Sequence, residues 1–284
     1  MTDGDLPSEP APEATDAEAA EVEGFVQAVF VRYGHDLRGY SRASLTRRLA
    51  VAVSRSPQDS LSRFQHDVLR SREAFTGLLD TLAVPATEMF RHPATWRLLR
   101  ERVIPRLSSY PRPNIWVAGS STGEEVYSIA IVLAEAGLLD RCVIHATDLS
   151  PAAVRSAREG IVPAESIKRY TENYQASGGV ESFSQYFTAA YGLASLDPAL
   201  RANVSFHQHS LAVDGPFGQM HLILCRNVLI YFDRALQDRA VGLFVQSLAR
   251  RGFLCLGSRE SLRFNAHGDA FDALDPTAQL YQLK

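Results

Sequence analysis

Hydrophobic side chains recur at helical spacing through the first third of the chain, from Glu21 to about Leu107. Apolar residues three and four positions apart line one face of an α-helix, whereas a half-buried strand alternates with a period of two. The helical sets are Phe25, Val26, Val29 and Phe30; Leu45, Leu49 and Ala52; and Leu61, Phe64, Val68 and Leu69. A further helix is expected from Pro93, because proline suits a first helical turn. We predict a helical N-terminal domain over residues 21–92.

The spacing of hydrophobic positions changes after residue 113. Short apolar runs now alternate with helical patterns, and the expected strands and helices are 114–118, 124–135, 142–147 and 150–160. The first run is closed by Gly119-Ser120-Ser121-Thr122-Gly123, and the second ends in Asp148. Strand and helix in such close alternation favour parallel βαβ units, so the expected fold class is α/β.

Residues 161–202 interrupt this alternation. They contain Gly178-Gly179 and a stretch rich in Ser, Phe and Tyr, which indicates a small inserted subdomain with a hairpin. The alternation then resumes, and the later elements are expected at 204–207, 221–225, 233–250, 253–257 and 279–283. The second domain is therefore predicted over residues 93–284, with 161–202 as its insertion.

Composition places the chain among globular proteins. It has 284 residues, of which 46% are hydrophobic and 21% charged. No apolar run reaches the roughly 18 residues that cross a bilayer, and no signal peptide is apparent, so we expect a soluble cytoplasmic protein. Residues 1–20 have almost no large apolar side chain and predict a disordered acidic tail.

Two acids, Glu124 and Glu125, follow the glycine-rich turn directly. A turn of this kind between a strand and a helix brings backbone N–H groups close to a ligand. Carboxylates there suit the helix dipole but repel a pyrophosphate. A ligand that carries an ammonium group and positive charge fits better than NAD or ATP. The alternative is that both acids only stabilise the start of the helix.

Asp148 stands at the carboxyl end of the second expected strand. An acid there can accept hydrogen bonds from both hydroxyls of a ribose. Asp148 could instead cap the following helix, a duty that Ser150 could share. With the glycine turn before it, we favour the ribose.

The glycine turn also matches Gly-x-Ser-x-Gly, the nucleophile turn of serine hydrolases. Asp197, Asp214 and His267 even follow in the order of hydrolase partners. However, such enzymes place several strands before the nucleophile, whereas the preceding third of this chain reads as helical. The hydrolase is a remote alternative. No pattern of metal ligands is apparent in the sequence.

Several segments together resemble the chemotaxis receptor methyltransferases, the CheR family. These segments are Ala86–Arg91, Trp116–Ser128, Ala146–Ser150, Cys225–Asp233, Gly252–Leu254 and Gly257–Leu262. The resemblance implies a class I fold that binds S-adenosyl-L-methionine (AdoMet), with a small helical N-terminal domain and an inserted β-subdomain. It implies methyl esterification of glutamate side chains on the cytoplasmic helices of chemoreceptors, with S-adenosyl-L-homocysteine (AdoHcy) as the product. It implies neither a nucleic-acid partner nor insertion into the membrane.

The resemblance also assigns roles by position. Arg91 and Tyr231 are expected nearest the methyl transfer. The residues expected to hold AdoMet are Thr87, Arg91, Glu125, Asp148, Ser210, Leu211, Asn227 and Val228. Positions that depart from the family pattern are Pro85, Met89, Gly119-Ser120, Ser210 and Arg259, which indicates a modified cofactor pocket.

Four arginines surround one expected helix of the N-terminal domain: Arg42, Arg47, Arg48 and Arg55. Arg48 and Arg55 are seven residues apart and are expected to share a face, with Arg47 beside it. Such a face could bind glutamate-rich receptor helices, or it could simply be solvated. A competing interpretation of the whole chain is a non-enzymatic CheR-like module that binds AdoMet or AdoHcy and regulates a partner.

Overall fold

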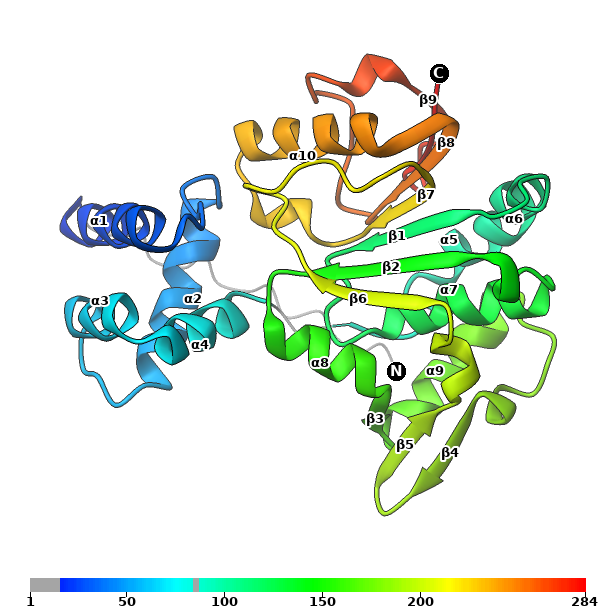
Figure 1. Cartoon of the computed structure of the whole chain (residues 1–284), viewed down its shortest axis with the longest axis horizontal. Coiled ribbons are helices and arrows are strands. Elements are labelled where there is room, and N and C mark those ends of the chain that lie inside the picture. Colours follow the sequence, from blue (N-terminus) through cyan, green and yellow to red (C-terminus); the bar gives the residue numbers. More distant parts are fainter. Residues whose placement is uncertain (1–15, 84–86) are drawn as a thin grey trace, which may run out of the picture.

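The computed structural model describes residues 16–83 and 87–284. Residues 1–15 of the expected acidic tail, and Pro85, lie outside this range. Within it, no helix is long and apolar enough to cross a membrane. The described chain forms a helical lobe beside a larger α/β part (Figure 1).

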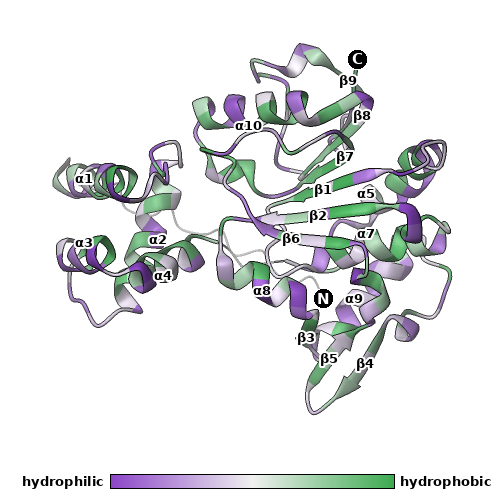
Figure 2. Cartoon of the chain, viewed as in Figure 1, coloured by the Kyte–Doolittle hydropathy of each residue, from purple (hydrophilic) through white to green (hydrophobic). Residues whose placement is uncertain are grey.

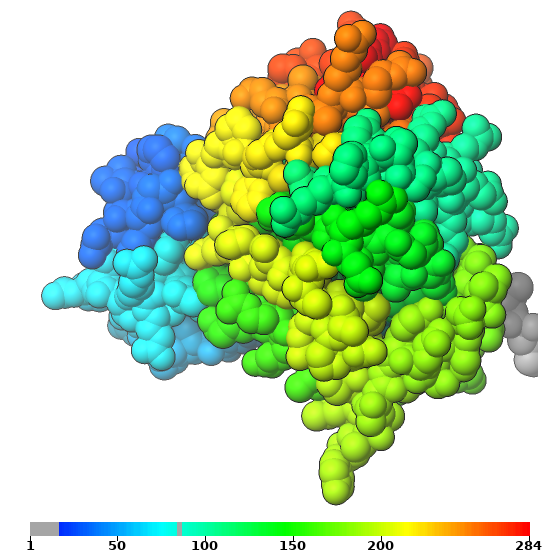
Figure 3. Space-filling view, turned by 45° about the vertical axis from the view of Figure 1, so that its right-hand side comes forward, coloured from blue at the N-terminus to red at the C-terminus, as the bar shows by residue number. Residues whose placement is uncertain are grey.

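Four helices form the lobe: α1 (Asp16–Tyr33), α2 (Arg42–Ser54), α3 (Leu61–Arg70) and α4 (Arg72–Leu82). The apolar faces predicted from spacing meet in a core of their own, which includes Phe25, Leu49 and Val68. Ser60 and Ser71 cap α3 and α4 by accepting hydrogen bonds from backbone N–H groups. Helix α1 begins at Asp16, five residues before the expected start, so the stretch 16–20 of the predicted tail is helical. Figure 3 shows this lobe, in blue and cyan, against segments of the larger part coloured green and yellow.

The larger part is built on a seven-stranded sheet in the order β6-β2-β1-β7-β8-β10-β9. Its strands are β1 (Asn114–Ala118), β2 (Val143–Asp148), β6 (Val204–Gln208), β7 (Met220–Cys225), β8 (Leu248–Leu256), β9 (Phe271–Asp275) and β10 (Leu280–Leu283). The first five in spatial order are parallel, whereas β10 runs antiparallel to both its neighbours. The predicted α/β fold is confirmed.

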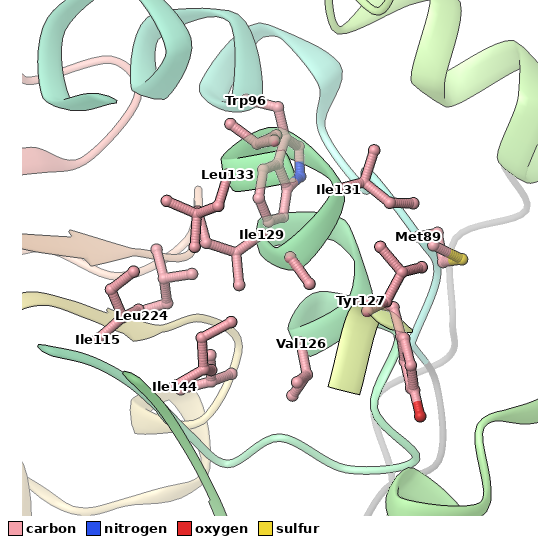
Figure 4. Packing of buried hydrophobic residues seen from close by; sticks show 14 of the residues in the cluster. Met89, Trp96, Ile115, Val126, Tyr127, Ile129, Ile131, Leu133, Ile144 and Leu224 are labelled. Atoms are coloured by element: carbon pink, nitrogen blue, oxygen red, sulfur yellow. The ribbon is translucent and has the colours of Figure 1, made fainter. Parts of the chain in front are cut away.

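Helices cover both faces of this sheet. They are α5 (Pro93–Leu98), a π-helical turn (Leu99–Val103), α6 (Ile104–Leu107), α7 (Glu124–Glu135), α8 (Pro151–Glu159) and α10 (Arg234–Ser247). Along β1, Ile115 and Val117 join the core under α7, whereas Trp116 and Ala118 join the core under α10. Figure 4 shows Val126, Ile129 and Leu133 of α7 directed at strand residues. In Figure 2, hydrophobic colour accordingly runs along β1 and β2.

The inserted segment forms a second, three-stranded sheet in the order β3-β5-β4. Its elements are β3 (Ile161–Pro163), α9 (Ser166–Ala176), β4 (Phe187–Ala190) and β5 (Leu193–Leu196). The expected hairpin is the antiparallel pair β4–β5. The insertion also contacts the segment that precedes α5, because Asn173 of α9 donates a hydrogen bond to the carbonyl of Met89 at 3.0 Å.

Two elements near the C-terminus differ from the prediction. Helix α10 ends at Ser247 and β8 begins at Leu248, so the expected helix to Arg250 is three residues too long. Strand β9 was not expected from the sequence. It lies at the sheet edge, and much of it is exposed. Polar residues interrupt its apolar residues, so its sequence lacks the regular alternation of apolar and polar residues that marks a strand.

Candidate active site

A cavity of about 380 Å³ lies where the carboxyl ends of the parallel strands meet the helical lobe. Crevices at this edge of a parallel sheet are the usual ligand sites of such folds. The cavity is lined by the nine residues expected to bind the cofactor or to act in methyl transfer: Thr87, Arg91, Glu125, Asp148, Ser210, Leu211, Asn227, Val228 and Tyr231. Their assembly follows from the sheet, but their individual roles stay predictions.

The glycine turn after β1 forms one wall. Gly119 has a φ of +76°, and a Cβ there would lie 2.3 Å from Val228 Cγ2. The backbone N–H groups of Gly119 and Ser120 donate to the carbonyl of Thr147 at 2.8 and 2.9 Å. Glycine is therefore required at position 119 both for its conformation and for the close approach of the Val228 side chain.

Asp148, the last residue of β2, is 8% exposed. Its Oδ2 accepts a hydrogen bond from the Ser121 N–H at 2.9 Å, and its Oδ1 accepts one from the Ser150 N–H at the same distance. Burial raises the pKa of this carboxyl, and these backbone bonds oppose the rise. The carboxylate is thus fixed at the cavity wall with lone pairs left for ligand hydroxyls.

Of the two acids at the start of α7, one faces the cavity. Glu125 lines it and pairs with Arg226 at 3.5 Å, and burial is the main cause of its raised pKa. Glu124 is buried elsewhere, where it accepts a hydrogen bond from Thr122 Oγ1 at 2.7 Å. Of these two acids, only Glu125 can therefore attract the charge of a ligand in the cavity.

Arg226 directly follows β7 and is 7% exposed. Its Nη2 donates to the carbonyl of Arg91 at 2.9 Å, and its guanidinium lies over the Trp96 ring at 5.6 Å. It therefore joins Glu125 to the segment that carries Thr87 and Arg91. Sequence reasoning missed this residue as a site member, although it stands inside the matched segment Cys225–Asp233.

Glu260 fixes the loop that carries Asn227 and Val228. Its carboxylate accepts hydrogen bonds from the backbone N–H groups of Gly257 and of residues 227–230, the shortest of the latter from Leu229 at 2.7 Å. It is 5% exposed, and burial raises its pKa against these bonds. This role was also missed, because it is apparent only once the loop and the end of β8 are adjacent.

We expect Glu260→Gln to destabilise the protein by about 1–2 kcal/mol. One carboxylate oxygen is replaced by an amide NH2 group, which cannot accept hydrogen bonds from backbone N–H groups. Chemical denaturation measures the free energy of unfolding. Asp238→Asn is the matched control, since Asp238 accepts one backbone N–H, from Ala266, and pairs with Arg234 at 3.4 Å, away from the cavity. Equal stability of the two variants would contradict the role of Glu260.

The helical lobe contributes a further wall. The backbone of Ser41 donates to the carbonyl of Tyr231 at 2.8 Å, and that of Asp233 donates to the carbonyl of Gly39 at 2.8 Å. Between them, Tyr40 lines the cavity and packs edge-on against Phe232. These bonds fix helix α2 against the loop that carries Tyr231. Tyr40 was not expected as a site residue.

Arg48 of α2 is 5% exposed and lines the cavity, with its guanidinium 4.1 Å from the centre of the Tyr231 ring. Its Nε and Nη2 are buried and have no hydrogen-bond partner among the described residues. Burial lowers its pKa, which Tyr231 and Tyr40 partly offset. Arg48 and Arg55, which were expected to share one face, differ in environment: Arg48 is buried against Tyr231, whereas Arg55 is exposed.

The other three arginines lie outside the cavity. Arg42 pairs with Glu23 at 3.3 Å, and Arg47 and Arg55 are exposed. At the opposite end of the cavity, Ser210 and Leu211 follow β6, and the Ser210 N–H donates to Asp214 Oδ2 at 2.7 Å.

A hydrolase triad is not assembled. Ser121 lines the cavity, but Asp197, Asp214 and His267 do not. Asp197 caps a helical turn in the insertion, and His267 lies against Gly242 of α10. Within residues 16–83 and 87–284, no group of three or more His, Cys, Asp or Glu side chains could hold a metal ion.

Comparison with known proteins gives consistent matches. The family model described as CheR methyltransferase, SAM binding domain, matches residues 85–279. The chain is 45% identical to "Putative methyltransferase Cher3" of Pseudomonas putida, over 92% of this chain and 96% of that protein. It is 28% identical to a chemotaxis protein methyltransferase of Listeria innocua, over 84% of this chain and 88% of that protein. A solved structure of magnesium protoporphyrin IX methyltransferase from Synechocystis with bound SAM is 12% identical, over 96% of this chain and 98% of that one, with a TM-score of 0.35.

Proposed function

The chain belongs to the CheR methyltransferase family and is an AdoMet-dependent methyltransferase, and from that premise we propose that it methylates glutamate carboxylates on the cytoplasmic helices of chemoreceptors. The product of this reaction is a glutamate methyl ester. The relatives' names support a chemotaxis role, the chemistry of the cavity supports a carboxylate as the acceptor, and the choice of glutamate follows from the family resemblance.

The residues that line the cavity fit AdoMet. We assign the ribose hydroxyls to Asp148 and the methionine ammonium to Glu125, because Asp148 is a buried carboxylate and Glu125 a largely buried one, and both line the cavity. Leu211 offers an apolar surface for the adenine. AdoMet supplies an electrophilic methyl group on a positively charged sulfur. The carboxylates of Glu125 and Asp148 near that charge are favourable.

One observation supports the acceptor most strongly: Arg48 presents a buried guanidinium to the cavity, with two nitrogens that lack hydrogen-bond partners in the described part of the chain. An arginine stays protonated at neutral pH and prefers a carboxylate that can accept two parallel hydrogen bonds. Leaving such groups unsatisfied costs free energy, which an incoming carboxylate would recover. A glutamate side chain fits this requirement.

The proposed transfer needs no general base. A glutamate carboxylate has an ordinary pKa of about 4.3 and is already an anion at neutral pH. One of its oxygens forms a bond to the methyl carbon while the carbon–sulfur bond breaks, and the electron pair leaves with the sulfur. No proton moves, and both charges disappear. A dry, positioned site therefore accelerates the reaction, and we assign Arg91 and Tyr231 to orienting the reactants rather than transferring protons.

The exposed face of α2 is the proposed docking surface for the acceptor helix. Arg47, Val51 and Arg55 recur every four residues and are all exposed. Because Arg48 of the same helix enters the cavity, a glutamate-rich helix lying along α2 would have a side chain within reach of the site.

Reversing the charge of this face, in the double variant Arg47→Glu/Arg55→Glu, is expected to raise the KM for the acceptor about five- to tenfold with kcat within twofold. Initial rates at varied acceptor concentration measure this. Arg63→Glu on α3 is the control, since Arg63 is also exposed but pairs with Asp59. An unchanged KM in the double variant would show that the acceptor docks elsewhere.

The direct test incubates the purified chain with tritiated AdoMet and membranes that contain chemoreceptors. Methanol released by base from labelled receptor reports a carboxyl methyl ester, which is the expected result. Equal affinity for AdoMet and AdoHcy, with no label transferred to any receptor, would instead identify a regulatory module that binds AdoMet.

A further inference from the structure

Asp80 lies on α4 of the helical lobe, yet its carboxylate reaches the start of α8 in the larger part. Its Oδ1 accepts a hydrogen bond from Ser150 Oγ at 2.6 Å and another from the Ala152 N–H at 3.1 Å. The two segments are separated by about 70 positions in the chain. This contact therefore depends on the docking of the lobe.

Ser150 is held from both sides. Its hydroxyl donates to Asp80 and accepts from the Ala153 N–H at 2.9 Å, while its own N–H donates to Asp148 Oδ1 at 2.9 Å. It is 2% exposed. A continuous series of hydrogen bonds thus runs from Asp80 through Ser150 to the carboxylate at the cavity wall.

This arrangement does more than cap a helix. Helix α8 already has Ser150 as its N-cap and Pro151 in its first turn. Asp80 moreover stands near another buried carboxylate, and its charge adds to the effect of burial in raising the pKa of Asp148. An acid beside an acid is electrostatically unfavourable, and the two hydrogen bonds that Asp80 accepts from Ser150 and Ala152 oppose this repulsion.

We propose that Asp80 is a positioning residue for AdoMet: through Ser150 it fixes the orientation in which Asp148 meets the ribose. The helical lobe thereby contributes to cofactor binding without touching the ribose. The inference rests on the ribose role proposed above for Asp148. It requires no statement about the methyl acceptor.

The test measures AdoMet binding to the purified full chain by calorimetry. Asp80→Ala is expected to weaken binding about five- to tenfold, whereas Asp80→Asn, which keeps an acceptor oxygen, is expected to stay within twofold. Asp67→Ala is the matched control, because Asp67 also accepts a side-chain hydrogen bond within the lobe, from Gln58 at 2.6 Å, but does not bond α8. Affinity unchanged in Asp80→Ala, or equally weakened in Asp80→Asn, would overturn the proposal.

A double-mutant cycle separates positioning from a general structural role. If Asp80 acts through Asp148, Asp80→Ala/Asp148→Ala binds AdoMet as tightly as Asp148→Ala alone. Additive losses would overturn the inference while leaving the ribose assignment intact. Unchanged binding by Asp148→Ala alone would instead reject that assignment itself. Should Asp80→Ala fail to fold, Ser150→Ala removes the same bond, and its affinity for AdoMet is expected to fall by the same factor; unchanged affinity would again overturn the proposal.

Discussion

Replacing Arg48 by methionine is expected to lower kcat/KM for the receptor acceptor by about 100-fold or more. Methionine keeps much of the side-chain volume but removes the guanidinium. A loss of this size corresponds to about 3 kcal/mol, the upper range for hydrogen bonds to a charged partner. The effect is large because the site is buried: Arg48 is 5% exposed, so water cannot replace it well.

The same substitution should leave the affinity for AdoMet within about threefold, because Arg48 is assigned to the acceptor. Calorimetry with AdoMet and steady-state rates with receptor membranes measure the two effects separately. Arg63→Met is the control, since Arg63 lies on α3, is exposed and is outside both the cavity and the proposed docking surface. If Arg48→Met kept full turnover, the assignment of the acceptor carboxylate to this guanidinium would be wrong.

Replacing Asp148 by alanine is expected to weaken AdoMet binding ten- to a hundredfold. Hydrogen bonds to a charged group contribute roughly 1.5–3 kcal/mol, which is the basis for this range. The substitution also leaves the N–H groups of Ser121 and Ser150 without their present acceptor. Calorimetric affinity that matches the parent would refute the ribose assignment.

Asp140→Ala is the matched control, because Asp140 is an exposed carboxylate just before β2, at the other end of the same strand. The pH dependence of AdoMet affinity provides a further check in the unsubstituted protein. Since burial raises the pKa of Asp148 and of Glu125, both carboxylates become protonated at a higher pH than exposed carboxylates on acidification. AdoMet affinity should therefore fall as the pH drops through these raised values and return on neutralisation.

The elements near the site were largely predictable from local pattern. The bounds of β1 and α7 match the expected 114–118 and 124–135, because a short apolar run, a glycine turn and a helical apolar stripe are all local signals. Ser150 and Asp233 act as helix caps, which short-range hydrogen bonding dictates. Helix α9 was missed although Ile167, Tyr170 and Tyr174 recur at helical spacing, and strand β9 was missed because its sequence lacks a clear alternation.

By itself, the sequence determined the α/β order of the chain, its glycine turn and the acids that follow the first two strands. Each depends on residues close together in the chain. Their spacing determines the periodicity of hydrophobic positions, the glycine turn and the helix caps. Only the tertiary structure decided that Arg48 is buried over Tyr231, that Glu260 accepts the N–H groups of residues 227–230, and that Asp80 reaches Ser150. These contacts join segments more than 25 positions apart. Their energy arises from burial and satisfied hydrogen bonds, which exist only after those segments have packed together.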